Sequence, residues 1–147
     1  MAATPRSGSV AAVDTSTDTI APATPYRLLC EDETAIRRIV DRFYDLMDQD
    51  PAYAALRTMH APDLDPMRDR LTWWLTNWFG GPPRYQENTG GGVCITAAHR
   101  GFPIDADARD QWLQCMRRAL MDTGTPDTVR QMVDGPLASM AEFLRNC

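Results

Sequence analysis

The sequence predicts an all-α protein. Four segments carry apolar residues three and four positions apart, the spacing that places them on one face of a helix. No segment shows the alternation of apolar and polar residues that is typical of a half-buried strand, and the apolar run 93–95 is short and isolated. Clusters of glycine and proline separate the four segments, so each helix is expected to end at such a cluster.

Length and composition indicate one domain with a substantial core, since the 147 residues are 44% hydrophobic. The net charge of −5 argues against nucleic acid or an anionic membrane surface as the main partner. We expect a cytoplasmic protein, because no apolar run is long enough to cross a bilayer and the start lacks a secretory signal. The four cysteines have no CxxC spacing, which favours reduced thiols over a metal or redox pair.

Residues 1–25 are rich in Ala, Thr, Ser and Pro and have no periodic apolar positions. Such a composition cannot bury enough apolar surface to offset the entropy of ordering the chain. We therefore expect a disordered N-terminal extension over 1–25 and a folded domain over 26–147.

The first long helix is expected over about 32–48. Tyr44 lies beside its apolar stripe, and Asp50-Pro51 ends it because a residue before proline avoids the helical region. A short helix over about 53–59 follows, and His60 then opens the loop His60-Ala61-Pro62. The stripe consists of Ile36, Ile39, Val40, Phe43, Leu46 and Met47.

The second long helix is expected over about 66–79, with Asp65 as its cap and Pro66 in its first turn. Gly80-Gly81-Pro82-Pro83 is a strong stop. Trp73 and Asn77 share one flank of its apolar face. That face consists of Met67, Leu71, Trp74, Leu75, Trp78 and Phe79. The tryptophans are either ordinary core residues or the wall around a flat ligand.

Two further helices are expected over about 105–121, capped by Asp105, and about 127–145. Their buried positions are Ala108, Trp112, Cys115, Met116, Ala119 and Leu120 in the first, and Val129, Met132, Val133, Leu137, Met140 and Leu144 in the second. Gly135-Pro136 predicts a kink or break in the last helix. A long structureless loop precedes position 105, and such loops tend to be functional.

His99 lies in that loop, between Gly90-Gly91-Gly92 and Gly101-Phe102-Pro103, and it is one of two histidines. Two interpretations remain open from the residues alone. His99 is a single axial ligand to haem iron in a pocket walled by the aromatic residues, or it is an ordinary loop histidine. A zinc site is not favoured, because a lone histidine has no second ligand nearby.

Several motifs occur in one order that resembles a known family, the group II truncated haemoglobins of bacteria, over about residues 30–146. The Gly-Gly-Pro-Pro turn and the run from His99 through Phe-Pro-Ile to Trp-Leu-x-Cys-Met are specific in combination. The matching segments are Val40–Met47, His60–Leu64, Trp78–Pro83, His99 with Phe102-Pro103-Ile104, and Arg109–Met116.

The resemblance implies a two-over-two helical sandwich around one haem b, with His99 as the proximal iron ligand. It also implies distal polar groups that face a bound ligand: the Tyr44 phenol, the Trp112 indole N–H and His60. Asn77 is the best candidate for a further residue that faces the ligand, with Trp73 or Trp74 less certain. Phe43 and the tryptophans, Trp74 among them, would cover the macrocycle.

The sequence also departs from the family pattern. The segment Ile95–Ala98 lacks the basic residues that usually precede the proximal histidine and pair with the haem propionates. Gly90-Gly91-Gly92 replaces the usual Gly-His-Pro. We therefore expect Arg84 or Arg100 to compensate in part.

Two classes of function follow from the resemblance. The first is a haem protein that binds O₂, nitric oxide or carbon monoxide, with nitric oxide dioxygenase or weak peroxidase activity supported by an unidentified reductase. The alternative is a haem-free module that keeps the globin fold for binding or sensing. The sequence leaves a monomer and a homodimer equally open.

Overall fold

The computed structural model describes residues 23–91 and 95–147, and these residues form helices without any strand. The all-α prediction is confirmed. Most of the predicted N-terminal extension lies outside the described residues, as does Cys94. Within the described ranges, no helix is both long and apolar enough to cross a membrane.

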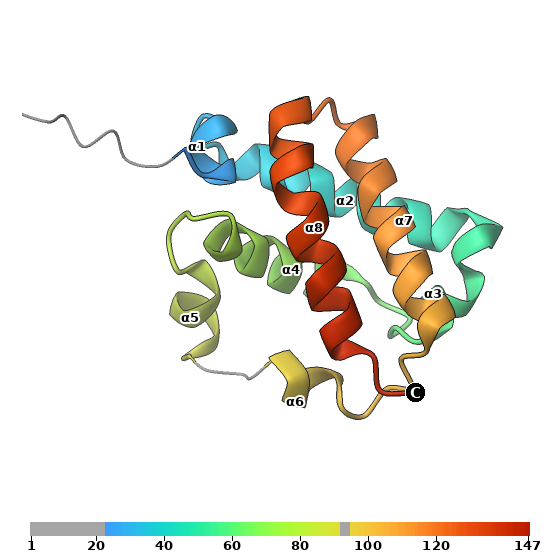
Figure 1. The fold of residues 1–147 in the computed structure, drawn as a ribbon. Helices are drawn as coiled ribbons and strands as arrows, with labels where there is room; N and C mark the ends of the chain where they lie inside the picture. The colour runs from blue at the N-terminus through green and yellow to red at the C-terminus, as the bar shows by residue number, and fades with distance from the viewer. Residues whose placement is uncertain (1–22, 92–94) are drawn as a thin grey trace, which may run out of the picture.

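Four long helices make up the fold, and all four lie within two residues of the predicted bounds. They are α2 (Glu33–Gln49), α4 (Asp65–Trp78), α7 (Ala106–Asp122) and α8 (Asp127–Leu144). Helix α2 packs against both α4 and α7, and α7 packs against α8. Figure 1 shows α7 and α8 side by side and running in opposite directions, across α2 and α4. The fold is therefore two helices over two.

Short helices connect these four. They are α1 (Pro25–Leu28), the 3-10 turn η1 (Pro51–Tyr53), α3 (Ala54–Thr58), α5 (Arg84–Thr89) and α6 (Ile95–His99). The prediction of a short helix near 53–59 is confirmed. The prediction of a structureless loop before position 105 is wrong, because α5 and α6 lie in it. Helices of five or six residues are too short to show a repeating apolar stripe.

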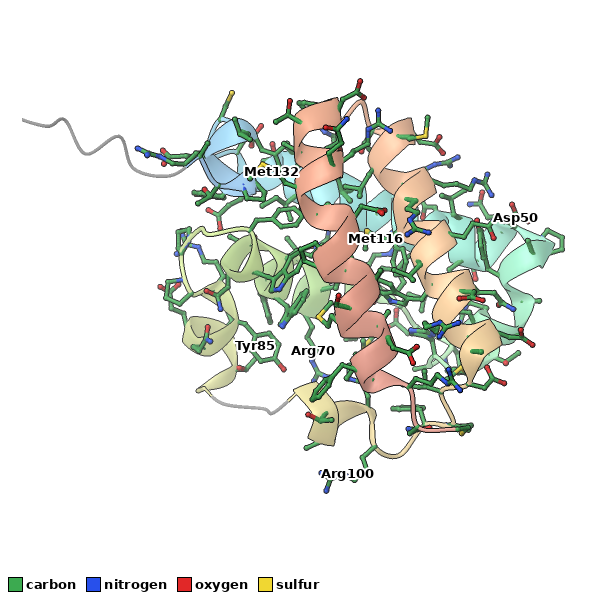
Figure 2. All side chains as sticks on the ribbon, viewed as in Figure 1. Asp50, Arg70, Tyr85, Arg100, Met116 and Met132 are labelled. Carbon is green, nitrogen blue, oxygen red and sulfur yellow. The ribbon has the colours of Figure 1, made fainter. Side chains whose placement is uncertain are left out.

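The core is formed mainly by α2, whose six predicted stripe residues are all buried, together with Tyr44. Cys115 and Met116 of α7 and Val133 of α8 pack against them. The prediction for Met132 is wrong: its side chain is 38% exposed, because α8 is an outer helix and Met132 lies on its solvent side. Figure 2 shows Met132 and Met116 on the two front helices.

Helix ends follow the predicted capping in part. The Asp105 carboxylate accepts a hydrogen bond from the N–H of Ala108 at 2.8 Å, which confirms it as the cap of α7. Asp65 is not the cap of α4 but its first residue, and the cap position is Leu64. The side chain that accepts a hydrogen bond from the first turn of α4 is Asp63, whose carboxylate accepts from the Asp65 N–H at 3.0 Å.

The predicted kink or break at Gly135-Pro136 does not interrupt α8, which is one continuous helix with Pro136 inside it. Proline removes one hydrogen bond from the helix. Val133 and Leu137 on either side are buried against the core, and their burial holds the helix together across that gap.

The Gly80-Gly81 turn lets α1 approach the end of α4. Gly80 has φ +97°, a conformation that other residues adopt at a cost. A Cβ atom on Gly81 would lie 2.7 Å from the Tyr26 ring and 2.8 Å from the Thr76 carbonyl oxygen. The Tyr26 N–H donates to the Phe79 carbonyl at 3.0 Å across this contact. Two glycines are therefore needed here for packing as well as for the turn.

A chain that begins at Ala23 is expected to keep the melting temperature and absorption spectrum of the full chain, because residues 1–22 have no apolar periodicity. A chain that begins at Leu29 also loses Tyr26 and its contact with Gly81, and it should melt about 4 °C or more lower. Thermal unfolding followed by circular dichroism tests both. A large loss of stability on starting at Ala23 would show that the extension packs on the core.

Candidate functional site

Four of the predicted site residues form one aromatic cluster. Phe43 and Tyr44 are neighbours on α2, and their ring centroids are 5.0 Å apart. Phe43 contacts Trp112 of α7 edge-on at 5.5 Å, and Tyr44 contacts His60 edge-on at 6.1 Å. The cluster therefore joins α2, α7 and the segment after α3.

Tyr44 is fixed in place while its hydroxyl is left without a partner. Its side chain is 2% exposed, and the Arg68 guanidinium lies 5.8 Å from its ring centroid. Asp45 and Asp41 hold Arg68 at 2.7 and 3.2 Å. Burial raises the pKa of Tyr44, so the phenol keeps its proton. Among the described residues nothing accepts a hydrogen bond from this hydroxyl, which leaves its O–H able to donate to a ligand.

Trp112 is positioned by a contact one turn further along α7. The Cys115 thiol donates to the Phe43 carbonyl at 3.2 Å and so joins α7 to α2. Burial raises the pKa of Cys115 to about 12, which keeps the thiol protonated and able to donate. Cys30 and Cys147 are exposed free thiols. Cys30, Cys115 and Cys147 form no disulfide in the described part of the chain, and their reduced state stays a prediction.

His60 follows α3, and its Nδ1 atom lies 2.9 Å from the Leu56 carbonyl oxygen. Burial lowers the pKa of His60, and the positive charges of Arg57 and His99 act in the same direction. The ring is therefore neutral at pH 7.

His99 is the last residue of α6 and is half-buried. The segment after it is clamped by the C-terminal end of the chain. The Asn146 side chain accepts from the Ile104 N–H at 2.9 Å and donates to the Phe102 carbonyl at 2.8 Å. Figure 1 shows α6 beside the C-terminal end of α8, which agrees with this clamp.

The apolar face of α4 is only partly covered by protein. Leu75 and Phe79 are buried, whereas the other four predicted residues of that face are half-buried and pack at the edge of the core. Trp74 and Trp78 stack with centroids 5.5 Å apart and an angle of 17° between their planes. A half-covered apolar face beside a core is typical of a pocket for an apolar ligand. The four are Met67, Leu71, Trp74 and Trp78.

Asn77 does not join the aromatic cluster. Its amide donates to Gln86 of α5 at 3.5 Å, and among the described residues it forms no hydrogen bond with Tyr44, His60 or Trp112. Trp73, on the same flank, is half-buried. Of the predicted distal residues, the structure thus brings together Tyr44, His60 and Trp112, whereas Asn77 lies against α5.

The arginines expected to pair with the haem propionates differ in whether they already form ion pairs within the protein. Arg84 lies 2.8 Å from Glu33 and 2.9 Å from Glu87, so both partners compete for its charge. Arg100 is exposed and forms no ion pair with any described residue, and the same holds for Arg70 of α4. In the view of Figure 2, Arg70 lies between α4 and α6, and Arg100 lies beyond α6.

The structure adds site residues that periodicity did not identify. Arg68 covers the Tyr44 ring, Cys115 connects Trp112 to α2, and Asn146 clamps the segment after His99. Gln111, the neighbour of Trp112, accepts from the Leu56 N–H at 3.2 Å. Each of these contacts joins residues more than 20 positions apart, so no local pattern predicts it.

Comparison with known proteins shows that most of the chain matches the globin family that its motifs resemble. Residues 25–146 match the family model described as bacterial-like globin. The group 2 truncated hemoglobin YjbI of Bacillus subtilis is 30% identical over 122 residues, which cover 83% of this chain and 88% of that protein.

Solved structures agree with this match. The group II 2-on-2 hemoglobin of Agrobacterium tumefaciens has a TM-score of 0.79 and 31% identity, with 87% of this chain and 98% of that one covered. The truncated oxygen-avid haemoglobin of Bacillus subtilis has a TM-score of 0.75 and 30% identity, with 84% and 100% covered.

Proposed function

This chain is a bacterial-like globin of the group II truncated haemoglobins, a family that binds haem b and small gases, and we propose that His99 holds its haem iron. The observation that carries the proposal is the pairing of a half-covered apolar face on α4 with the unpartnered hydroxyl of the buried residue Tyr44. A flat apolar macrocycle would cover that face, and a ligand beside it would accept from Tyr44.

The described residues fit a porphyrin better than a directly bound metal ion. In residues 23–91 and 95–147, no three His, Cys, Asp or Glu side chains are grouped to hold a metal. Haem needs a single protein imidazole, and when bound it supplies an iron that coordinates a diatomic gas. We assign that role to His99, the last residue of α6.

The remaining site residues have separate tasks in this proposal. Tyr44 and Trp112 donate hydrogen bonds to the ligand, since phenol O–H and indole N–H are both donors. Phe43 and Trp74 cover the macrocycle and exclude water. Arg70 and Arg100, which have no carboxylate partner among the described residues, pair with the propionates in place of Arg84.

We propose O₂ as the principal ligand. The relative from Bacillus subtilis is described as oxygen-avid, and two donors in one aromatic cluster suit a ligand that gains negative charge on binding. Nitric oxide removal or peroxidase turnover would be a further activity that draws electrons from a reductase.

We also propose that the protein acts in the cytoplasm. The cytoplasm is reducing, and this suits the free thiols of Cys30, Cys115 and Cys147.

The visible absorption spectrum tests this proposal. The protein, purified or mixed with an equimolar amount of ferric haem, is expected to show a Soret band that shifts when dithionite and carbon monoxide are added. Apomyoglobin treated in the same way is the positive control. A spectrum that stays that of free haem would support the alternative, a haem-free binding or sensing module on the same fold.

A further inference from the structure

The hydrogen bond to Leu56 determines which nitrogen of His60 carries the proton. A carbonyl oxygen can only accept, so Nδ1, at 2.9 Å from it, must be the donor. A neutral imidazole has one N–H, and Nε2 is then an acceptor. The resemblance implies that His60 is a distal polar group beside Tyr44 and Trp112, and this geometry makes it an acceptor, whereas those two residues are donors.

The peptide that orients His60 is itself held from the other side. The Leu56 N–H donates to the Gln111 side-chain oxygen at 3.2 Å. Gln111 directly precedes Trp112 in α7. This helix therefore carries the indole N–H of Trp112, and through Gln111 it also holds the Leu56 residue whose carbonyl sets the tautomer of His60. Because Leu56 lies in α3, this bond fixes α3 relative to α7.

His60 and Tyr44 face one another without a hydrogen bond between them. Their rings meet edge-on at 6.1 Å between centroids, with 75° between the planes. Among the described residues, neither Nε2 of His60 nor the hydroxyl of Tyr44 has a hydrogen-bond partner. A donor and an acceptor on opposite sides of one space complement a group that can both accept and donate, such as O–H.

We propose that His60 Nε2 accepts a hydrogen bond from ligands that carry an O–H group, hydroperoxides above all, and that Gln111 is the positioning residue that keeps Nε2 in that role. The inference rests on the haem-binding function proposed above and gives the pocket a second ligand class. O₂, nitric oxide and carbon monoxide carry no hydrogen and cannot use this acceptor. A hydroperoxide can donate to Nε2 while its oxygens accept from Tyr44 or Trp112.

The charges around His60 keep it an acceptor near neutral pH. Burial disfavours a proton on the ring and the charge of Arg57 on α3 acts in the same direction, whereas the hydrogen bond to Leu56 opposes them. Arg68, which lies over Tyr44, is neutralised by Asp41 and Asp45. No carboxylate is recorded among the groups that act on the His60 ring.

The first test reads the tautomer directly. Long-range ¹⁵N–¹H correlation spectra of the ferrous carbon monoxide complex should show His60 protonated at Nδ1 and unprotonated at Nε2. Gln111→Glu keeps an oxygen acceptor for the Leu56 N–H and should preserve this pattern. Gln111→Leu removes the acceptor and should mix the two tautomers. A wild-type ring protonated at Nε2 overturns the proposal.

The second test compares two probes in the holoprotein. His60→Leu should slow the bimolecular reaction of the ferric protein with hydrogen peroxide about tenfold, the upper range for one hydrogen bond. Carbon monoxide association with the ferrous protein should change less than about twofold. His60→Gln, which restores an oxygen acceptor, should recover most of the peroxide rate.

These outcomes separate the two proposals. An intact Soret band with an unchanged peroxide rate in His60→Leu overturns the role of His60 and leaves haem binding in place. The absence of a Soret band overturns haem binding itself. The thermal unfolding of each variant is compared with that of the wild type, so that a folding defect is not taken for a lost hydrogen bond.

Discussion

Replacing His99 with alanine is expected to remove most of the bound haem, with affinity reduced at least about tenfold. His99 is the residue we assign to the iron, and in the described chain no other histidine than His60 could replace it. His60 lies against Tyr44, which we assign to the side of the bound ligand, so His60→Ala should retain haem. The ratio of Soret absorbance to protein absorbance after gel filtration measures both variants.

A chemical rescue sharpens this test. Adding imidazole to His99→Ala should restore part of the haem content, because the missing side chain leaves space for a free ligand of the same chemistry. Imidazole should have no such effect on His60→Ala. If His60→Ala loses haem while His99→Ala keeps it, the assignment of the two histidines is reversed.

Removing the hydroxyl of Tyr44 is expected to speed O₂ release about tenfold, since about 1.4 kcal/mol of stabilisation of the bound ligand is lost. Trp112→Phe should act in the same direction through the lost indole N–H. Carbon monoxide is less polar when bound, so its release should change less and mainly through the space left by Trp112. Stopped-flow measurement of O₂ and carbon monoxide dissociation compares the variants.

Tyr53→Phe is a matched control for Tyr44→Phe. Tyr53 is also fully buried, but its hydroxyl accepts from Arg118 at 3.2 Å, away from the aromatic cluster. This variant should alter stability and leave O₂ release unchanged. Non-additive effects in the Tyr44→Phe, Trp112→Phe double variant would indicate one shared network. If neither single change alters O₂ release, the assignment of Tyr44 and Trp112 as donors to the ligand is overturned.

Local patterns in the sequence determined the long helices. The stripe of α2 predicts burial at each of its positions because residues three and four apart share one helix face, and the structure buries them all. The Asp105 cap and the Gly80-Gly81 turn follow from the same kind of near-neighbour chemistry. The motif order that ends in Trp112 identified the family, since it reflects the fold as a whole.

Only the tertiary structure decided which hydrogen bonds and ion pairs the site residues form. The tautomer of His60 depends on Leu56 and Gln111, and Gln111 lies 55 positions from Leu56. Whether Arg84 is available depends on Glu33 of another helix. The periodicity of apolar residues indicates which side of a helix is buried, but it does not indicate which residue of another helix contacts a given side chain. The direction of a hydrogen bond across two helices is set by their packing, and this is why the sequence names candidate site residues but does not say which of them is an acceptor.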